Sequence, residues 1–139
     1  VALSIADSVA NNNGSYDVMY MAIIKNVGNS LLKNIQLTDS LQKCFTDSVT
    51  FQLVGKPTVK TGSTLKVNPN FDGKTDLNLL IADSTAQLAV GKQDTVLFTV
   101  KIYNNGNPGP FKNQVIAKGI GNGTLVTDLS NDGTEVKVN

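Results

Sequence analysis

The sequence has no histidine, no tryptophan and no arginine among its 139 residues. Without histidine, the chain lacks the usual general base of enzymes, any Ser–His–Asp triad and the commonest transition-metal ligand. All 12 basic residues are lysines, so no guanidinium group can pair with guanine or phosphate through two hydrogen bonds. The 11 acidic residues leave a net charge of +1. We therefore expect no catalysis and no nucleic-acid binding.

Cysteine and long apolar runs are also scarce. Cys44 stands alone, which excludes an internal disulfide and a zinc cluster of thiolates. Because it precedes Phe45, we predict a buried structural thiol. No apolar run approaches the roughly 20 residues of a membrane span, and the first residues have no basic segment before an apolar one. We expect a soluble domain that does not insert into a membrane, with any signal peptide upstream of this sequence.

What the sequence does contain is a repeated alternation of short apolar runs and turn residues. Clusters of Gly, Asn, Asp and Ser separate segments rich in Val, Ile, Leu, Thr, Tyr and Phe. This rhythm is typical of an all-β fold, and the length suits a single domain over residues 1–139. We predict an immunoglobulin-like antiparallel β-sandwich of about eight or nine strands. The expected strands lie at 2–9, 15–27, 31–41, 48–55, 57–60, 63–67, 94–106, 111–121 and 134–139.

Period-two alternation predicts which side chains face the core. In 15–27 the even positions from Tyr16 to Ile24 are the chosen core face. In 31–41 the odd positions are the apolar ones, and they include Ile35, Leu37 and Asp39. No window shows helical spacing, and a short helical turn is allowed only at 83–90.

The stretch Asn68 to Leu80, "NPNFDGKTDLNLL", is the best internal candidate for a cation site. Its Asn and Asp side chains supply the hard oxygen atoms that Ca²⁺ requires, but no bidentate Glu follows them. The alternative, which we favour, is that these side chains bond to their own backbone in turns. The predicted metal ligands in this stretch are Asn68, Asn70, Asp72 and Asp76.

A second candidate for Ca²⁺ is "DLSNDGTE", where Asp128, Ser130 and Asp132 have the first spacings of an EF-hand loop. The twelfth position of that loop is Asn139 instead of Glu, so the full motif is absent. A looser hypothesis is that Ca²⁺ binds here together with groups from a following repeat. An acidic turn that leads into a linker is the favoured alternative.

Five segments in order resemble a known family. They are "GSYDVMYMAIIKNVGNSLLKNIQLTDSL", "NPNFDGKTDLNLL", "LAVGKQDTVLFTVKI", "GPFKNQVIAKGIG" and "TDLSNDG", which span Gly14 to Gly133. Together they resemble the DUF11 or conserved-repeat domain of bacterial cell-surface proteins. The resemblance implies one unit of a tandem array in a larger secreted or surface-anchored protein. It implies a non-catalytic spacer, stalk or adhesin module at the cell surface, with neighbouring repeats as partners.

The resemblance to surface proteins raises the hypothesis of two covalent modifications. An isopeptide bond between a Lys and an Asn, as in some surface sandwiches, needs a nearby carboxyl group in an apolar core. The candidates on or near predicted strands are Lys25, Asn26, Asn34 and Asn113. O-glycosylation in the phylum of gliding bacteria uses an Asp-Ser/Thr-apolar consensus, which predicts sites at Ser8, Ser40, Ser48, Ser84 and Thr95.

A binding module is the alternative function that the sequence leaves open. Sandwich domains bind carbohydrate or protein through end loops, and sugar platforms use exposed aromatic rings. Phe71, Tyr103 and Phe111 are the aromatic residues near expected loops. A glycosidase built on Asp72 and Asp76 is the least favoured hypothesis, because nothing in the sequence indicates a cleft or a raised pKa there.

Overall fold

The computed structural model describes residues 1–46, 49–107, 109–130 and 134–136. These residues form nine strands and one short helix. In chain order the elements are β1 (Ala2–Ala10), β2 (Ser15–Lys25), β3 (Leu32–Thr38), α1 (Leu41–Cys44), β4 (Thr50–Val59), β5 (Gln93–Tyr103), β6 (Phe111–Asn113), β7 (Ile116–Gly121), β8 (Thr124–Leu129) and β9 (Thr134–Val136).

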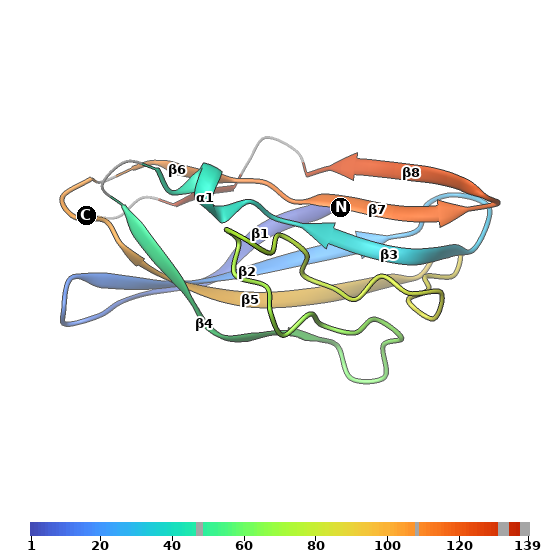
Figure 1. The fold of residues 1–139 in the computed structure, drawn as a ribbon, viewed down its shortest axis with the longest axis horizontal. Helices are drawn as coiled ribbons and strands as arrows, with labels where there is room; N and C mark the ends of the chain where they lie inside the picture. The colour runs from blue at the N-terminus through green and yellow to red at the C-terminus, as the bar shows by residue number, and fades with distance from the viewer. Residues whose placement is uncertain (47–48, 108, 131–133, 137–139) are drawn as a thin grey trace.

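Two antiparallel sheets make the two layers of the molecule. One sheet has the strand order β1-β2-β5-β4 and the other has the order β3-β7-β8. Figure 1 shows the second sheet stacked over the first, with most strands along the long axis. A third, two-stranded sheet pairs β6 with β9. The prediction of an all-β, immunoglobulin-like antiparallel sandwich of about eight or nine strands is confirmed.

The central pair β2 and β5 supplies much of the core. Their register sets Val18 opposite Val100 and Tyr20 opposite Phe98, and all four side chains are buried. The Tyr20 and Phe98 rings stack with their centroids 5.3 Å apart. Because successive side chains alternate between faces, this register buries one apolar row from each strand against β3. The predicted core face of 15–27 is confirmed.

The second sheet buries the predicted odd positions from Ile35 on, whereas Leu31 and Lys33 are exposed because the register shifts between Lys33 and Gln36. Ile35 and Leu37 are enclosed, and Asp39, just beyond the strand, is 1% exposed. Leu41 in α1 is also fully buried. The short helix was not predicted, and residues 83–90, where a helical turn was allowed, contain turns and a bridge instead. Four residues are too few for a helical pattern, so burial of Leu41 is what fixes α1.

Strand boundaries differ from the prediction at three places. Residues 48–55 and 57–60, expected as two strands, contribute to the single strand β4, which bulges between Val54 and Thr58. Residues 63–67 contribute only an isolated bridge from Val67 to Leu80. The expected strand 111–121 divides into β6 and β7.

Strand β8 is not among the strands expected from the sequence. All six of its side chains are exposed, so it has no buried alternating face to reveal it. It follows β7 through a two-residue turn in which Asn122 and Gly123 both have positive φ, at 53° and 76°. Asn-Gly is the strongest short signal for such a hairpin, and that signal would have found the strand.

Candidate functional site

The loop that contains Asp72 is organised around its carboxylate. Oδ1 of Asp72 accepts hydrogen bonds from the backbone N–H groups of Lys74, Thr75 and Asp76 at 2.8, 2.9 and 3.0 Å. Oδ2 accepts a hydrogen bond from the Thr75 hydroxyl at 2.7 Å. The hydrogen bond from Asp76, followed by those from the Thr75 hydroxyl and Lys74, holds the pKa of Asp72 well below its usual range. The Asp72 side chain thus bonds to the backbone of its own turn, as the favoured alternative to a cation site predicts.

The other predicted ligands of this stretch belong to the same network. Nδ2 of Asn68 donates to Oδ2 of Asp76 at 2.9 Å, and Oδ1 of Asp76 accepts from the N–H of Asn78 at 3.0 Å. Oδ1 of Asn68 accepts from the N–H of Asn70 at 3.1 Å. The structure therefore brings the four residues into one loop, in which the side-chain oxygen atoms of Asn68, Asp72 and Asp76 already accept hydrogen bonds and Asn70 contributes its backbone N–H. Among the described residues, no group of three or more His, Cys, Asp or Glu could hold a metal ion.

Replacing Asp72 with Ala should lower the free energy of unfolding by about 1–2 kcal/mol. The variant removes an acceptor for three N–H groups and a hydroxyl, in a loop that is partly exposed to water. Asp72→Asn is the matched control, because its amide oxygen still accepts the N–H groups, and it should lose about half as much. Urea denaturation of the three proteins measures the difference. Equal losses in both variants would show that charge, and not the acceptor, supports the turn.

The stretch 128–135 does not form the predicted ligand loop over its described part. Asp128 lies in β8, and its carboxylate pairs with the amino group of Val1. Ser130 is buried, and its hydroxyl oxygen accepts a hydrogen bond from the N–H of Val115 at 3.0 Å. Asp128 and Ser130 thus have separate partners, at Val1 and at Val115. Asp132 lies outside the described residues.

The predicted aromatic platform is wrong for two of its three rings. Phe71 and Phe111 are only 4% and 5% exposed. Phe71 packs edge-on against Phe98, with centroids 5.8 Å apart, and Phe111 packs against Phe45 at 5.5 Å. Tyr103, at the end of β5, is half-buried. Long-range packing draws both phenylalanines into the core, so no exposed sugar platform is made from this set.

The predicted glycosylation sites differ in accessibility. Ser8 on β1 and Ser84 in a turn are exposed. Ser40, before α1, and Thr95, within β5, are half-buried. Ser48 lies outside the described residues. Of the sites that are described, Ser8 and Ser84 are the most open to a transferase.

A buried polar cluster lies between the sheets near α1. Asp39 and Asn113 are each 1% exposed, and Nδ2 of Asn113 donates to Oδ2 of Asp39 at 2.7 Å. Oδ1 of Asp39 and the hydroxyl of Tyr20 are both buried without a hydrogen-bond partner. Burial raises the pKa of Asp39 to about 7, although the hydrogen bond from Asn113 opposes the shift. Burial also raises the pKa of Cys44 to about 12, and Asp39 adds to that effect.

This cluster provides the carboxyl and amide groups of the predicted isopeptide chemistry, but no lysine. Lys25 is exposed, and every other lysine whose side chain is described is exposed except Lys101, which pairs with Asp17 at 3.2 Å. The side-chain amides of the other two Asn candidates donate hydrogen bonds to backbone carbonyl oxygens. Asn26 donates to the carbonyl oxygens of Ser30 and Leu88, and Asn34 donates to that of Ala82.

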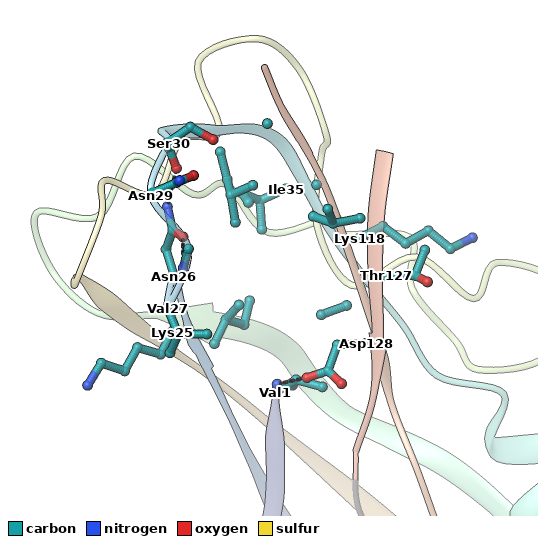
Figure 2. Close-up of a pocket in the computed structure, with 17 residues that line it drawn as sticks. Val1, Lys25, Asn26, Val27, Asn29, Ser30, Ile35, Lys118, Thr127 and Asp128 are labelled. Atoms are coloured by element: carbon teal, nitrogen blue, oxygen red, sulfur yellow. Dashed lines mark hydrogen bonds and ion pairs between the residues drawn. The ribbon is translucent and has the colours of Figure 1, made fainter. Parts of the chain in front are cut away.

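A cleft of about 490 Å³ lies between the β2–β3 turn and the β7–β8 hairpin. Figure 2 shows Val1 and Asp128 facing each other on one side of it, with Asn29 and Ser30 opposite. Its wall includes two buried glycines. A Cβ on Gly119 or Gly121 would come within 3.0 Å of a side chain of β3. Glycine at these two positions therefore lets β7 lie close to the side chains of Leu32 and Ile35.

No protein-family model matches this sequence, and no curated protein sequence matches it. Solved structures with a similar fold include two of a bacterial pilin. Domains D2 and D3 of the major pilin SpaD from Corynebacterium diphtheriae match 94% of this chain at 18% identity, with a TM-score of 0.58. Full-length SpaD matches the same share at 18% identity and a TM-score of 0.57. The likeness is one of fold.

The chain spans 49% of the two-domain SpaD chain and 33% of the full-length one. In both structures the similar region is thus one part of a longer protein. Within the described residues, no helix has the length and apolar character needed to cross a membrane.

Proposed function

We propose that this chain is a non-catalytic structural module of a bacterial cell-surface protein and acts as a spacer or stalk unit. The observation that carries the proposal is the fold likeness to a major pilin, which extends over 94% of the chain. That the similar region fills only part of the pilin supports a role as one unit among several. The resemblance of the sequence to conserved surface repeats points to the same role, with neighbouring repeats as the partners.

The arrangement of polar groups supports this proposal over an enzyme. The carboxylates of Asp72 and Asp76 accept hydrogen bonds from their own loop, which leaves them poorly placed for acid–base chemistry. Asp39 has the raised pKa expected of a general acid, but it is enclosed in the core. The alternative of a carbohydrate-binding module loses its platform with the burial of Phe71 and Phe111.

Surface labelling of the source cells tests the proposal. An antiserum raised against the purified chain should label intact cells, and brief protease treatment of intact cells should remove that label. A cytoplasmic enzyme followed in the same cells serves as the control and should be unaffected by the protease. Labelling that requires permeabilised cells would contradict the proposed location.

A Ca²⁺ ion in the 68–78 loop is kept as a separate proposal. Its support is that the loop brings the carboxylates of Asp72 and Asp76 and the amide of Asn68 into one hydrogen-bonded network. An ion would have to displace hydrogen bonds that the oxygen atoms of Asp72 already accept. Calorimetric titration with Ca²⁺ of the wild-type chain and of Asp72→Ala decides the matter. Binding heat that the variant loses supports the ion, and the absence of heat in the wild type removes it.

A further inference from the structure

Strand β8 is an open edge of the sheet β3-β7-β8. It pairs with β7 over six residues, from Ile116 opposite Leu129 to Gly121 opposite Thr124, without a bulge. All of its side chains are exposed, and it has no lysine, proline or glycine. Lysine, proline and bulges are the usual devices that prevent another strand from pairing at an edge. β8 has none of these three devices, and its one charged side chain, Asp128, pairs with the amino group of Val1. The N–H and C=O groups that face away from β7 are therefore open to pairing.

The other three edges of the two main sheets are interrupted or covered. β4 bulges within 54–58, a stretch that includes Lys56 and Pro57. β1 bulges within 5–7. β3 is bridged along its free side to the connection 60–92, at residues 78 and 88. The contrast singles out β8 as the regular, unprotected edge.

The outward side chains of β7 and β8 form two exposed apolar pairs, with Lys118 and Thr127 between them. Leu125 and Leu129 are 62% and 51% exposed, and their neighbours across the hairpin, Ile120 and Ile116, are each 38% exposed. An exposed hydrophobic group of this kind on an unpaired edge is a recurrent mark of strand addition.

The spacing of these side chains is self-complementary. Two antiparallel β8 strands related by a twofold axis at Thr127 place Leu125 of each copy opposite Leu129 of the other. Each such leucine pair lies in a row across the merged sheet. On one side of the pair Ile120 lies beside Leu125, and on the other side Ile116 of the second copy lies beside Leu129. An axis at Val126 would instead set Leu125 against Thr127. An axis at Asp128 would bring two carboxylates directly opposite, which is unfavourable.

We propose that β8 pairs with β8 of a second copy of this chain, antiparallel and with the twofold axis at Thr127. The two β3-β7-β8 sheets then merge into one continuous sheet, and the leucines and isoleucines of both copies cover each other on its outer face. Thr127 faces its own counterpart. The contact is one strand wide, so the association is of the weak, reversible class.

Disulfide trapping tests both the contact and its register. In Thr127→Cys, the two cysteines would face each other with Cα atoms roughly 4.5–5.5 Å apart, which suits a disulfide. Mild oxidation should convert most of this variant to a covalent dimer. Thr124→Cys is the matched control, because its two copies would lie about 20 Å apart along the strands. The wild-type chain, with Cys44 alone, should remain uncrosslinked. Crosslinking of Thr124→Cys to the same extent would overturn the register.

Sedimentation velocity from about 10 µM to about 1 mM tests the association without crosslinks. The wild-type chain should show a concentration-dependent dimer. Thr127→Lys, which places two ammonium groups opposite each other, should stay monomeric at least tenfold higher in concentration. Gln52→Lys adds the same charge on exposed β4 and should dimerise as the wild type does. A wild-type chain that is monomeric throughout, or a dimer that Thr127→Lys leaves intact, would overturn the proposal.

Discussion

Asp39→Asn should raise the free energy of unfolding at pH 7 and above by up to about 4 kcal/mol. In the folded protein the pKa of Asp39 is raised to about 7 from 3.8, first of all by burial. Asparagine has the shape of the neutral acid, and its amide oxygen can still accept the hydrogen bond from Asn113. The variant should therefore keep the stability that the wild type loses because the unfolded chain ionises Asp39 readily and the buried carboxyl does not.

The pH dependence has a definite sign. Below about pH 4, Asp39 is protonated in both the folded and the unfolded wild-type chain and costs nothing. Between about pH 4 and pH 7 the unfolded chain releases the proton while the folded chain keeps it, so wild-type stability falls as pH rises. Above about pH 7 the loss is complete. The difference between variant and wild type should grow over the same interval.

Urea denaturation at intervals from about pH 4 to pH 8 measures this difference. Asp7→Asn, on exposed β1, is the matched control and should follow the wild type at each pH. The groups around Asp39 are Asn113 on β6, Tyr20 on β2 and Cys44 on α1, and burial raises the pKa of the latter two as well. A variant that differs from the wild type by a constant amount across the range would show that Asp39 does not titrate in this interval.

Gly73→Ala should lower the free energy of unfolding by about 3 kcal/mol. Gly73 has φ +74°, and a Cβ there would lie 2.6–2.7 Å from three side-chain carbon atoms of Leu41. Leu41 is fully buried in α1, so it has little room to move. The carbonyl oxygen of Gly73 also accepts a hydrogen bond from Gln42 at 3.1 Å, so the loop and the helix are fixed against each other.

Gly62→Ala is the control that measures the cost of a positive φ without a steric clash. Gly62 has a similar φ of +87°, but nothing lies within 4 Å of the Cβ that would be added. This control should lose only about 1 kcal/mol, because the strain of a positive φ is its whole cost. Thermal or urea denaturation gives both values. Equal losses in the two variants would mean that Leu41 moves aside without cost.

The sequence predicted those parts of the fold that follow from the alternation of apolar and polar residues along a strand. The alternation in β2 and β5 revealed their buried faces, because a strand packed on one side needs an apolar residue at every second position. The same alternation placed Asp39 on a buried face. Its partner Asn113 is 74 residues away, and no local pattern records such a pairing.

Residues whose environment depends on distant packing could not be predicted. Phe71 and Phe111 stand beside turn residues in the sequence, which favoured exposure, but contacts with Phe98 and Phe45 bury them. In the 68–78 loop, the same Asn and Asp side chains could either bind a cation or bond to the backbone in turns. Composition alone could not distinguish these two uses. The hydrogen bonds to Asp72 show how these side chains are used in the structure.

The long connection of residues 60–92 contains no regular strand, yet side chains of the sandwich hold it at several points. Gln36 bonds both the N–H and the carbonyl oxygen of Leu80, and Asn26 ties the carbonyl oxygen of Leu88 to the β2–β3 turn. Leu79 and Leu80 are buried in the shared core. We therefore expect this irregular segment and the sheets to unfold as one cooperative unit, so that the amide of Leu80 exchanges with solvent only when the whole domain opens.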